Sequence, residues 1–244
     1  MEVTGLGRGS ESDSDDGEDE CFYGCHHVIR RLEEDFYSKF IEKKIRGGIS
    51  VVMKHRLMIA TRNLHKVEEI RAILSDFEVL DLSAIKDSPE VEETGTSFLE
   101  NAKLKAEAIS ALTDALVLSD DSGLEVDALA GAPGVYSSRY AGEEGNDPLN
   151  NAKLLREMAG VENRVARFRC VMVLAQNGTS LADFSGAVEG RILEEGQGEG
   201  GFGYDPLFAP EGYDQSFAEL GENVKNGMSH RSRALEGVAR WLSR

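Results

Sequence analysis

The sequence predicts an α/β domain whose sheet is mixed rather than strictly parallel. Short apolar runs alternate with helical patterns from Met53 onwards. Two long runs are separated by a hairpin signal at 176–178, and an amphipathic pattern ends the chain. Alternation of strands and helices favours parallel pairing, whereas a hairpin joins antiparallel neighbours, so we expect both kinds of pairing in one sheet.

The expected elements follow in chain order from their apolar periodicity. We expect strands at 57–60, 79–82 and 116–119 and helices at 64–74, 97–112 and 149–158, followed by long strands at 166–175 and 181–189.

Local capping and turn residues support these assignments. Ser97 is a candidate N-cap with Glu100 three residues later, which is the capping-box pattern. The sequence Gln176-Asn177-Gly178 favours a tight hairpin turn. Ser229 is the expected N-cap of a last helix, whose apolar residues are Leu235, Val238 and Leu242.

Size and composition bound the protein class. The chain has 244 residues, of which 41% are hydrophobic, and this suits one globular domain with an appendage or two small lobes. No apolar run approaches the roughly 20 residues of a membrane helix, and the acidic N-terminus does not resemble a secretory signal. Three cysteines form no disulfide framework, so we expect a cytoplasmic protein.

The net charge of −17 restricts the binding partners. Such a surface repels nucleic acid and anionic membranes, and we expect neither as a partner. A small phosphate ligand remains compatible with this charge, because a few Lys and Arg residues in a cleft act at short range while distant charges are screened.

The first 52 residues differ from the rest and form an N-terminal extension to a domain at 53–244. The run 11–20 holds seven acids, so we expect 1–20 to be disordered. Apolar residues at helical spacing predict an amphipathic helix at 28–46, which Gly47 and Gly48 end. Met53 resembles a fresh protein start.

The extension also contains Cys21, Cys25, His26 and His27, which are residue types of a zinc site. The cysteine spacing is tight and the two histidines follow without the usual separation. A variable tail is the competing interpretation.

The first candidate binding cluster follows a strand and opens a helix. It consists of Thr61, Arg62, Asn63, Leu64, His65 and Lys66. The first turn of a helix favours an anion, Lys66 adds a charge, and Thr61 and Asn63 add hydrogen bonds. The glycine spacing of a P-loop is absent. An ordinary turn capped by Asn63 is the alternative.

Two further clusters are acidic. Glu92 and Glu93 precede a helix that carries Lys105, and Asp120 and Asp121 follow an apolar strand. Carboxylates suit Mg²⁺, and two adjacent acids repel each other unless a cation or a proton intervenes. We expect the aspartates at the carboxyl end of their strand, where α/β ligand sites form. A solvated helix start and an Asp-rich turn are the alternatives.

The last clusters offer a ring and hydrogen-bond donors. Phe202 lies among glycines at 200–203, so its ring is a candidate platform on which a base can stack. Lys225, His230 and Arg231 offer donors at or near a helix N-terminus. A flexible loop and a surface cap are the alternatives.

In this order and spacing, the clusters resemble the inosine triphosphate pyrophosphatases, which act on nonstandard purine nucleoside triphosphates. The resemblance covers 57–242. It rests on 60–63 with Lys66, on 92–95 with Phe98, Glu100, Asn101, Ala102 and Lys105, and on 119–124, 132–140, 202–206 and 229–231. Arg62 stands where family members often have glycine, and the extension has no counterpart.

The resemblance implies an elongated two-lobed α/β fold with a cleft between the lobes, and a homodimer. It implies hydrolysis of ITP, dITP and XTP to the monophosphate and pyrophosphate with Mg²⁺. Residues 61–66 and Lys105 would hold the triphosphate, and Glu92 and Asp121 would bind Mg²⁺, with Asp121 also the general base. The nucleotide would be held by Ser122, Phe202, Gly203, Tyr204, Asp205, Lys225, His230 and Arg231.

Two other function classes compete with this interpretation. The first is a related pyrophosphatase that acts on pyrimidine or modified triphosphates. That group has a Ser-x-Ser-Pro-Arg-Arg motif near its start, and residues 61–66 do not match it. A nucleotide sensor without catalysis would retain Lys66 and Phe202 but would not need Asp121.

Overall fold

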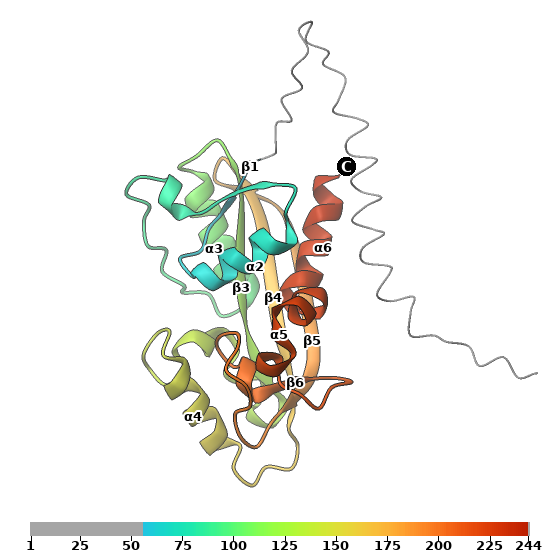
Figure 1. Ribbon diagram of the computed structural model, residues 1–244. Coiled ribbons are helices and arrows are strands. Elements are labelled where there is room, and N and C mark those ends of the chain that lie inside the picture. The colour runs from blue at the N-terminus through green and yellow to red at the C-terminus, as the bar shows by residue number, and fades with distance from the viewer. Residues whose placement is uncertain (1–55, 244) are drawn as a thin grey trace, which may run out of the picture. The chain divides into compact units, whose positions relative to one another are not determined.

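The computed structural model describes residues 56–243 and shows one mixed sheet of six strands in the order β2-β1-β3-β4-β5-β6 (Figure 1). The strands are β1 (Arg56–Ile59), β2 (Glu78–Leu80), β3 (Leu116–Val126), β4 (Val165–Gln176), β5 (Thr179–Ile192) and β6 (Phe208–Pro210). β1 pairs in parallel with β2 and β3, and the other pairs are antiparallel. The predicted α/β class with a mixed sheet is confirmed. The expected disordered run, helix and zinc residues of the extension lie outside the described residues.

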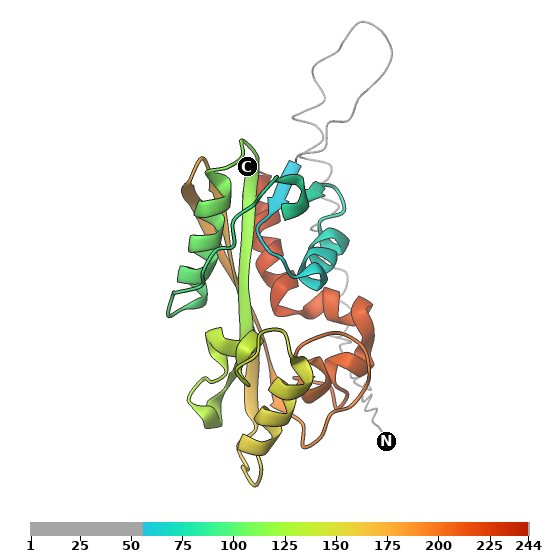
Figure 2. The same cartoon turned by 90° about the vertical axis from the view of Figure 1, so that its left-hand side faces the viewer.

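Helices cover both faces of the sheet. They are α2 (Leu64–Ile73), α3 (Phe98–Ser110), α4 (Asp147–Glu157), α5 (Phe217–Met228) and α6 (His230–Leu242), with short 3₁₀ turns η1 (Leu82–Ala84), η2 (Asp127–Leu129), η3 (Gly134–Arg139) and η4 (Asp205–Leu207). α3 packs on one face of β3 and β4, while α2 and α6 pack together on the other (Figure 2). Within residues 56–243, no helix has the length and apolar character needed to cross a membrane.

Local chemistry fixes the element boundaries much as the sequence predicts. The Ser97 hydroxyl accepts from Glu100 N at 3.2 Å, and the Glu100 carboxylate accepts from Thr96 N at 2.7 Å. In the β4–β5 hairpin, Asn177 and Gly178 have φ of 50° and 75°, a left-handed conformation that this residue pair tolerates. Residues close in sequence make these contacts, so sequence alone locates them.

Strand β3 is the clearest difference from the expected elements. The sequence predicts a strand at 116–119 with Asp120 and Asp121 at its carboxyl end, but β3 continues to Val126. β4 pairs with it throughout, and this places Asp120 opposite Met172 and Asp121 opposite Val171. The expected strand end was wrong because β4, some 50 residues away in sequence, provides the hydrogen bonds that continue the strand.

The described part of the chain has two lobes, each with its own hydrophobic core. Leu118 of β3 and Met172 of β4 belong to a core shared with α2 and α6. Leu124 of β3 and Phe168 of β4 belong to a second core shared with α4, β6 and α5. The long strands therefore connect the lobes, and the polar stretch 119–122 lies between the two cores. The predicted two-lobed fold is confirmed.

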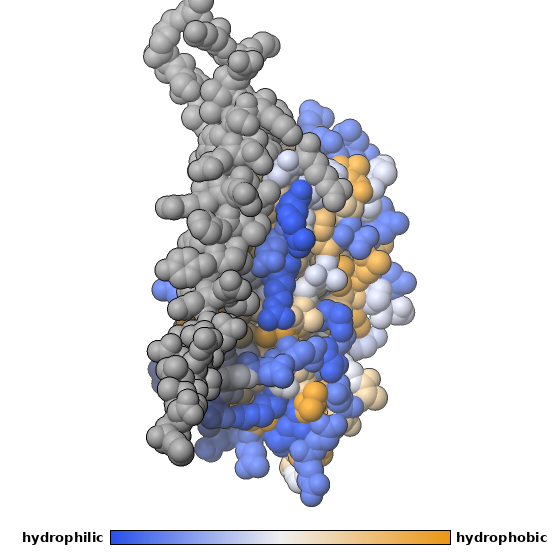
Figure 3. Space-filling model, turned by 90° about the vertical axis from the view of Figure 1, so that its right-hand side faces the viewer, coloured by the Kyte–Doolittle hydropathy of each residue, from blue (hydrophilic) through white to orange (hydrophobic). Residues whose placement is uncertain are grey.

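The visible surface is mixed in hydropathy. In the face shown in Figure 3, hydrophilic side chains alternate with smaller apolar areas. Exposed apolar residues such as Leu149 and Leu181 occur on many soluble surfaces and identify no site by themselves.

Candidate active site

A cleft of about 850 Å³ brings together the residue clusters that the sequence singled out. It is lined by Thr61, Arg62, Asn63, His65, Lys66, Glu92, Glu93, Lys105, Asp121, Ser122, Phe202, Gly203, Tyr204, Asp205, Lys225, His230 and Arg231. Leu64 is the exception among the candidate residues, since its side chain is 67% exposed and is not part of this lining. As the first residue of α2, Leu64 can meet a ligand in the cleft only through its backbone.

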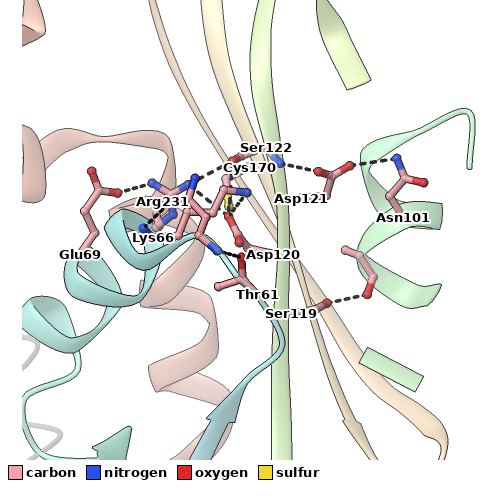
Figure 4. A network of polar contacts seen from close by, with 12 residues as sticks. Thr61, Lys66, Glu69, Asn101, Ser119, Asp120, Asp121, Ser122, Cys170 and Arg231 are labelled. Atoms are coloured by element: carbon pink, nitrogen blue, oxygen red, sulfur yellow. Dashed lines mark hydrogen bonds and ion pairs between the residues drawn. The ribbon is translucent and has the colours of Figure 1, made fainter. Parts of the chain in front are cut away.

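The cleft opens where β1 ends and β3 continues. Ala60 N donates to Leu118 O at 2.8 Å, and this is the last hydrogen bond that links the first strand segment to β3. The chain then turns through 61–63 into α2, with Asn63 as N-cap accepting from Lys66 N at 3.3 Å. Side chains from the start of α2 therefore lie beside Asp120, Asp121 and Ser122 of β3 (Figure 4).

Asp120 is fully buried on the side of β3 that faces α2 and α6. Its Oδ2 lies 3.2 Å from Lys66 Nζ and 3.1 Å from Arg231 Nη2 (Figure 4). Burial alone would raise the pKa of Asp120, but the charges of Lys66 and Arg231 outweigh it and hold the pKa below its ordinary value. Asp120 is therefore an ionised anchor for two of the cations expected at the substrate.

Arg231 is also fully buried, and this revises its expected role as a free donor. Its Nη1 pairs with Glu69, and its Nη2 donates to Ser122 Oγ at 3.0 Å as well as to Asp120. Arg231 Nε has no hydrogen-bond partner within residues 56–243. Arg231 Nε is therefore a buried donor that a ligand in the cleft can use.

Glu69 completes this charged cluster and was missed by the sequence reasoning. Lys225 Nζ lies 2.7 Å from Glu69 Oε1 and 2.7 Å from Asp205 Oδ2. Glu69 follows Lys66 by three residues, so the helical spacing places both on one face of α2. That spacing was the available signal, but the partners Lys225 and Arg231 come from α5 and α6 and are distant in sequence.

Asp121 lies on the opposite side of β3, facing α3. Its Oδ2 accepts from Asn101 Nδ2 at 3.2 Å, and its Oδ1 accepts from Ser122 N at 3.1 Å and lies 3.7 Å from Lys105 Nζ. Burial raises the pKa of Asp121, and the nearby Lys105 and Lys66 only partly oppose this effect. A carboxylate with a raised pKa accepts a proton more readily, which suits a general base.

The acidic pair before α3 divides between two environments. Glu93 Oε1 lies 2.6 Å from Lys105 Nζ, and Glu93 Oε2 lies 3.9 Å from Arg139 Nη1. Glu92 is exposed at the edge of the cleft. The sequence named Glu92 as the metal ligand, and the structure adds its neighbour Glu93, which is linked to Asp121 through Lys105.

The loop at 202–205 is anchored firmly to the second lobe. Tyr204 donates its hydroxyl proton to Ser137 O at 2.9 Å. Asp205 Oδ2 accepts from Phe202 N at 2.9 Å as well as from Lys225. Tyr204 and Asp205 are thus buried anchors of the loop, while Phe202 keeps its ring in the cleft lining with Lys225 Nζ 4.4 Å from the ring centroid.

His230 begins α6 and is fully buried against Phe168, with ring centroids 5.0 Å apart and planes inclined by 14°. Burial and the neighbouring cations Arg231 and Lys225 lower the pKa of His230 well below its usual range, so the imidazole is neutral near pH 7. Its Nδ1 has no hydrogen-bond partner among the described residues. A buried polar atom without a partner beside a cleft suits a ligand contact.

The oxygen donors in the cleft fit a magnesium ion that arrives with phosphates. The described residues contain no ready-made group of three or more metal-ligating side chains. Mg²⁺ in phosphate-transfer sites is typically held by one or two carboxylates together with water and substrate phosphates. Asp121 and Glu92 are two such carboxylates at the cleft, and Glu93 lies beside Glu92 in the same lining.

Comparison with known proteins gives consistent matches. The model of the Ham1 family matches residues 57–241. A dITP/XTP pyrophosphatase of Bacillus licheniformis is 50% identical over 190 residues, covering 76% of this chain and 97% of the relative. A dITP/XTP pyrophosphatase of Bacillus subtilis is 45% identical over 196 residues, covering 79% of this chain and 98% of the relative.

Solved structures agree with these matches. The Ham1 protein of Staphylococcus aureus superposes with a TM-score of 0.70 at 40% identity, covering 77% of this chain and 97% of that one. A HAM1 protein from Coxiella burnetii superposes with a TM-score of 0.71 at 38% identity, covering 78% of this chain and 98% of that one. The chain described here belongs to the Ham1 family.

Proposed function

We propose that this Ham1-family chain hydrolyses deaminated purine nucleoside triphosphates, namely ITP, dITP and XTP, to the monophosphate and pyrophosphate with Mg²⁺. One observation carries the proposal. A single cleft joins Asp121, whose carboxylate is held by Asn101 and Ser122, to the cations Lys66 and Lys105 and to the ring of Phe202. The dITP/XTP pyrophosphatases among its relatives support the substrate class.

In this proposal Asp121 is the general base that acts on water. Its carboxylate takes a proton as the water oxygen attacks the α-phosphorus, and the bond from this phosphorus to the α–β bridging oxygen breaks. Pyrophosphate leaves with the electron pair of that bond, so no covalent enzyme intermediate is required. Asn101, which donates to Asp121 Oδ2, and Ser122, which donates to Oδ1 through its backbone, fix the carboxylate for this transfer.

Charge neutralisation falls to side chains on both sides of β3. Lys66 and Lys105 lie near Asp121 at the cleft and offer ammonium groups to the phosphates. Glu92 and Asp121, with Glu93 close by, would hold Mg²⁺, which when bound supplies positive charge that stabilises the phosphate oxygens. Residues 61–63 add backbone and side-chain donors at the N-terminus of α2.

Discrimination against adenine follows from Arg231 Nε, a donor in every protonation state. This N–H is buried and has no partner within the described chain. The 6-oxo group of hypoxanthine or xanthine accepts a hydrogen bond, whereas the 6-amino group of adenine offers another donor. Binding adenine would leave the Arg231 donor unsatisfied, and such a group costs more than an ordinary hydrogen bond contributes. Guanine shares the 6-oxo group, so its exclusion needs a different contact.

The test is release of pyrophosphate from a panel of nucleoside triphosphates with Mg²⁺ and with a chelator. We expect ITP and XTP to react far faster than ATP, and the chelator to abolish turnover. Equal rates on ATP and ITP would contradict the base selectivity. Release of single orthophosphates would contradict attack at the α-phosphorus.

We also propose a homodimer, which rests on the family resemblance of residues 57–242. Light scattering after size-exclusion chromatography measures the mass directly. A monomer at all protein concentrations would overturn this proposal without affecting the reaction. The cytoplasmic location expected from composition stays a prediction.

A further inference from the structure

Phe202 is held in place from one lobe of the protein. Gly203, the next residue, is clamped on both backbone groups by α4. Its N–H donates to Asp147 Oδ2 at 2.6 Å, and its carbonyl accepts from Asn151 Nδ2 at 3.0 Å. Together with the bond from Phe202 N to Asp205, these contacts fix the backbone that carries the ring.

His65 approaches the same ring from the other lobe. It is the second residue of α2, and its ring centroid lies 5.3 Å from that of Phe202 with the planes inclined by 13°. Its side chain is 65% exposed, and its Nδ1 is 4.0 Å from the exposed carboxylate of Glu68. The sequence grouped His65 with the phosphate-binding turn, but the structure directs its ring to the base platform.

We propose that His65 is the second stacking wall of the base site, so that the bound purine lies between His65 and Phe202. This inference rests on the proposed nucleotide substrate and adds a specificity-determining residue to the site. Both rings line the cleft and face each other nearly in parallel, which is the arrangement that a flat base between them requires.

The geometry also identifies which ring moves. A base between two rings needs about 7 Å between their planes, since stacked atoms approach to about 3.5 Å on each side. The present centroid separation is 5.3 Å, so the pair must open to admit a base. Phe202 is fixed by its loop, whereas His65 is exposed and can change rotamer at low cost, so His65 is the residue that opens and closes.

The two products of the proposed reaction separate stacking from phosphate binding. IMP carries the base, and pyrophosphate has none. We would measure both dissociation constants by calorimetry for the wild type, His65→Ala, His65→Phe and the control Glu68→Ala. Glu68 lies on the same helix, is exposed and does not line the cleft, so its loss should change neither constant.

We expect His65→Ala to weaken IMP binding by about 5- to 150-fold, the range for one base–aromatic stack, and to leave pyrophosphate binding unchanged. His65→Phe should restore IMP binding, because its ring also stacks. The KM for ITP should follow the same order, with kcat changing much less.

Three outcomes would overturn the inference. Tighter IMP binding by His65→Ala would mean that His65 covers Phe202 as a lid that the base displaces. An equal loss for IMP and pyrophosphate would mean that the change acts through the phosphate-binding turn. No change in either constant would remove His65 from the site.

These outcomes differ from a failure of the proposed function. If the wild type releases pyrophosphate from ITP, the proposed function stands in all three cases. A wild type that neither turns over ITP nor binds IMP would overturn both the proposed function and the role of His65.

Discussion

Asp120 and Asp121 are adjacent on β3 but lie on opposite sides of it, in two regions of different character. Asp120 faces α2 and α6 and is ion-paired with Lys66 and Arg231. Asp121 faces α3, borders the cleft and is hydrogen-bonded by Asn101. Burial raises the pKa of both carboxyls, yet the pKa of Asp120 is lowered overall because two cations contact it, while that of Asp121 is raised.

The difference shows how one residue type takes two roles. Successive side chains of a strand point to opposite faces, so neighbours in sequence meet different partners. On one side, ion pairs among Asp120, Glu69, Arg231, Lys66 and Lys225 link β3 to α2, α5 and α6. On the other, the pKa of Asp121 is raised, as our proposal of a general base requires.

The largest expected effect is on stability, from Asp120→Asn. The change leaves Lys66 and Arg231 without their shared carboxylate, and breaking a buried ion pair costs about 3–5 kcal/mol. Urea unfolding at pH 7, where Asp120 is ionised, measures the loss. Asp121→Asn is the matched control and should not lower stability comparably, because burial already disfavours the charge of Asp121. Equal losses from the two variants would break the comparison.

The next effect is on turnover, from Asp121→Asn. If this carboxylate takes the proton from water and helps to hold the metal, the nearly isosteric change should lower kcat by about 10²-fold or more. Initial rates of pyrophosphate release from ITP provide the measurement, with circular dichroism as the check of folding. Near-native turnover by a folded variant would remove Asp121 from the mechanism.

A smaller and more selective effect on catalysis is expected from Arg231→Ala. The variant is compared at a temperature where it is folded, because the change also removes the ion pairs with Asp120 and Glu69 and lowers stability. Loss of its Nε donor should lower kcat/KM for ITP by an amount equivalent to about 1–3 kcal/mol of transition-state stabilisation, as for other buried hydrogen bonds. The kcat/KM for ATP should fall much less. Lys66→Ala should weaken the binding of ITP and of ATP to the same extent, because an ammonium group at the phosphates does not contact the base. If Arg231→Ala lowers kcat/KM for ITP and for ATP by the same factor, Arg231 contacts phosphate, and other residues determine the selectivity for the base.

The smallest effect is expected from removing residues 1–52. The cleft, both aspartates and their partners all come from residues 56–243, so a chain that begins at Met53 should fold and retain its kcat/KM. Thermal unfolding and pyrophosphate release from ITP test this against the full chain. An insoluble or inactive product would show that the extension is structural and that the boundary at Met53 is wrong.

The sequence by itself determined the elements that depend on near neighbours. Apolar periodicity located α2, α3, α4 and α6 but missed α5. Ser97 and Asn63 cap their helices, and Asn177-Gly178 forms the hairpin turn. Each of these features is decided within a few residues by hydrogen bonding or backbone conformation. The sequence also identified the residue clusters that line the cleft, because their order and spacing resemble those of a known family.

Only the tertiary structure decided what the individual side chains do. β4 continued β3 through the two aspartates, and Arg231, 111 residues from Asp120, determined which of them became the anchor. Likewise, His65 and Phe202 meet across the cleft although they lie far apart in sequence. The physical reason is common to these cases. Burial and ion pairing depend on which distant elements pack together, and no spacing within the chain reports that.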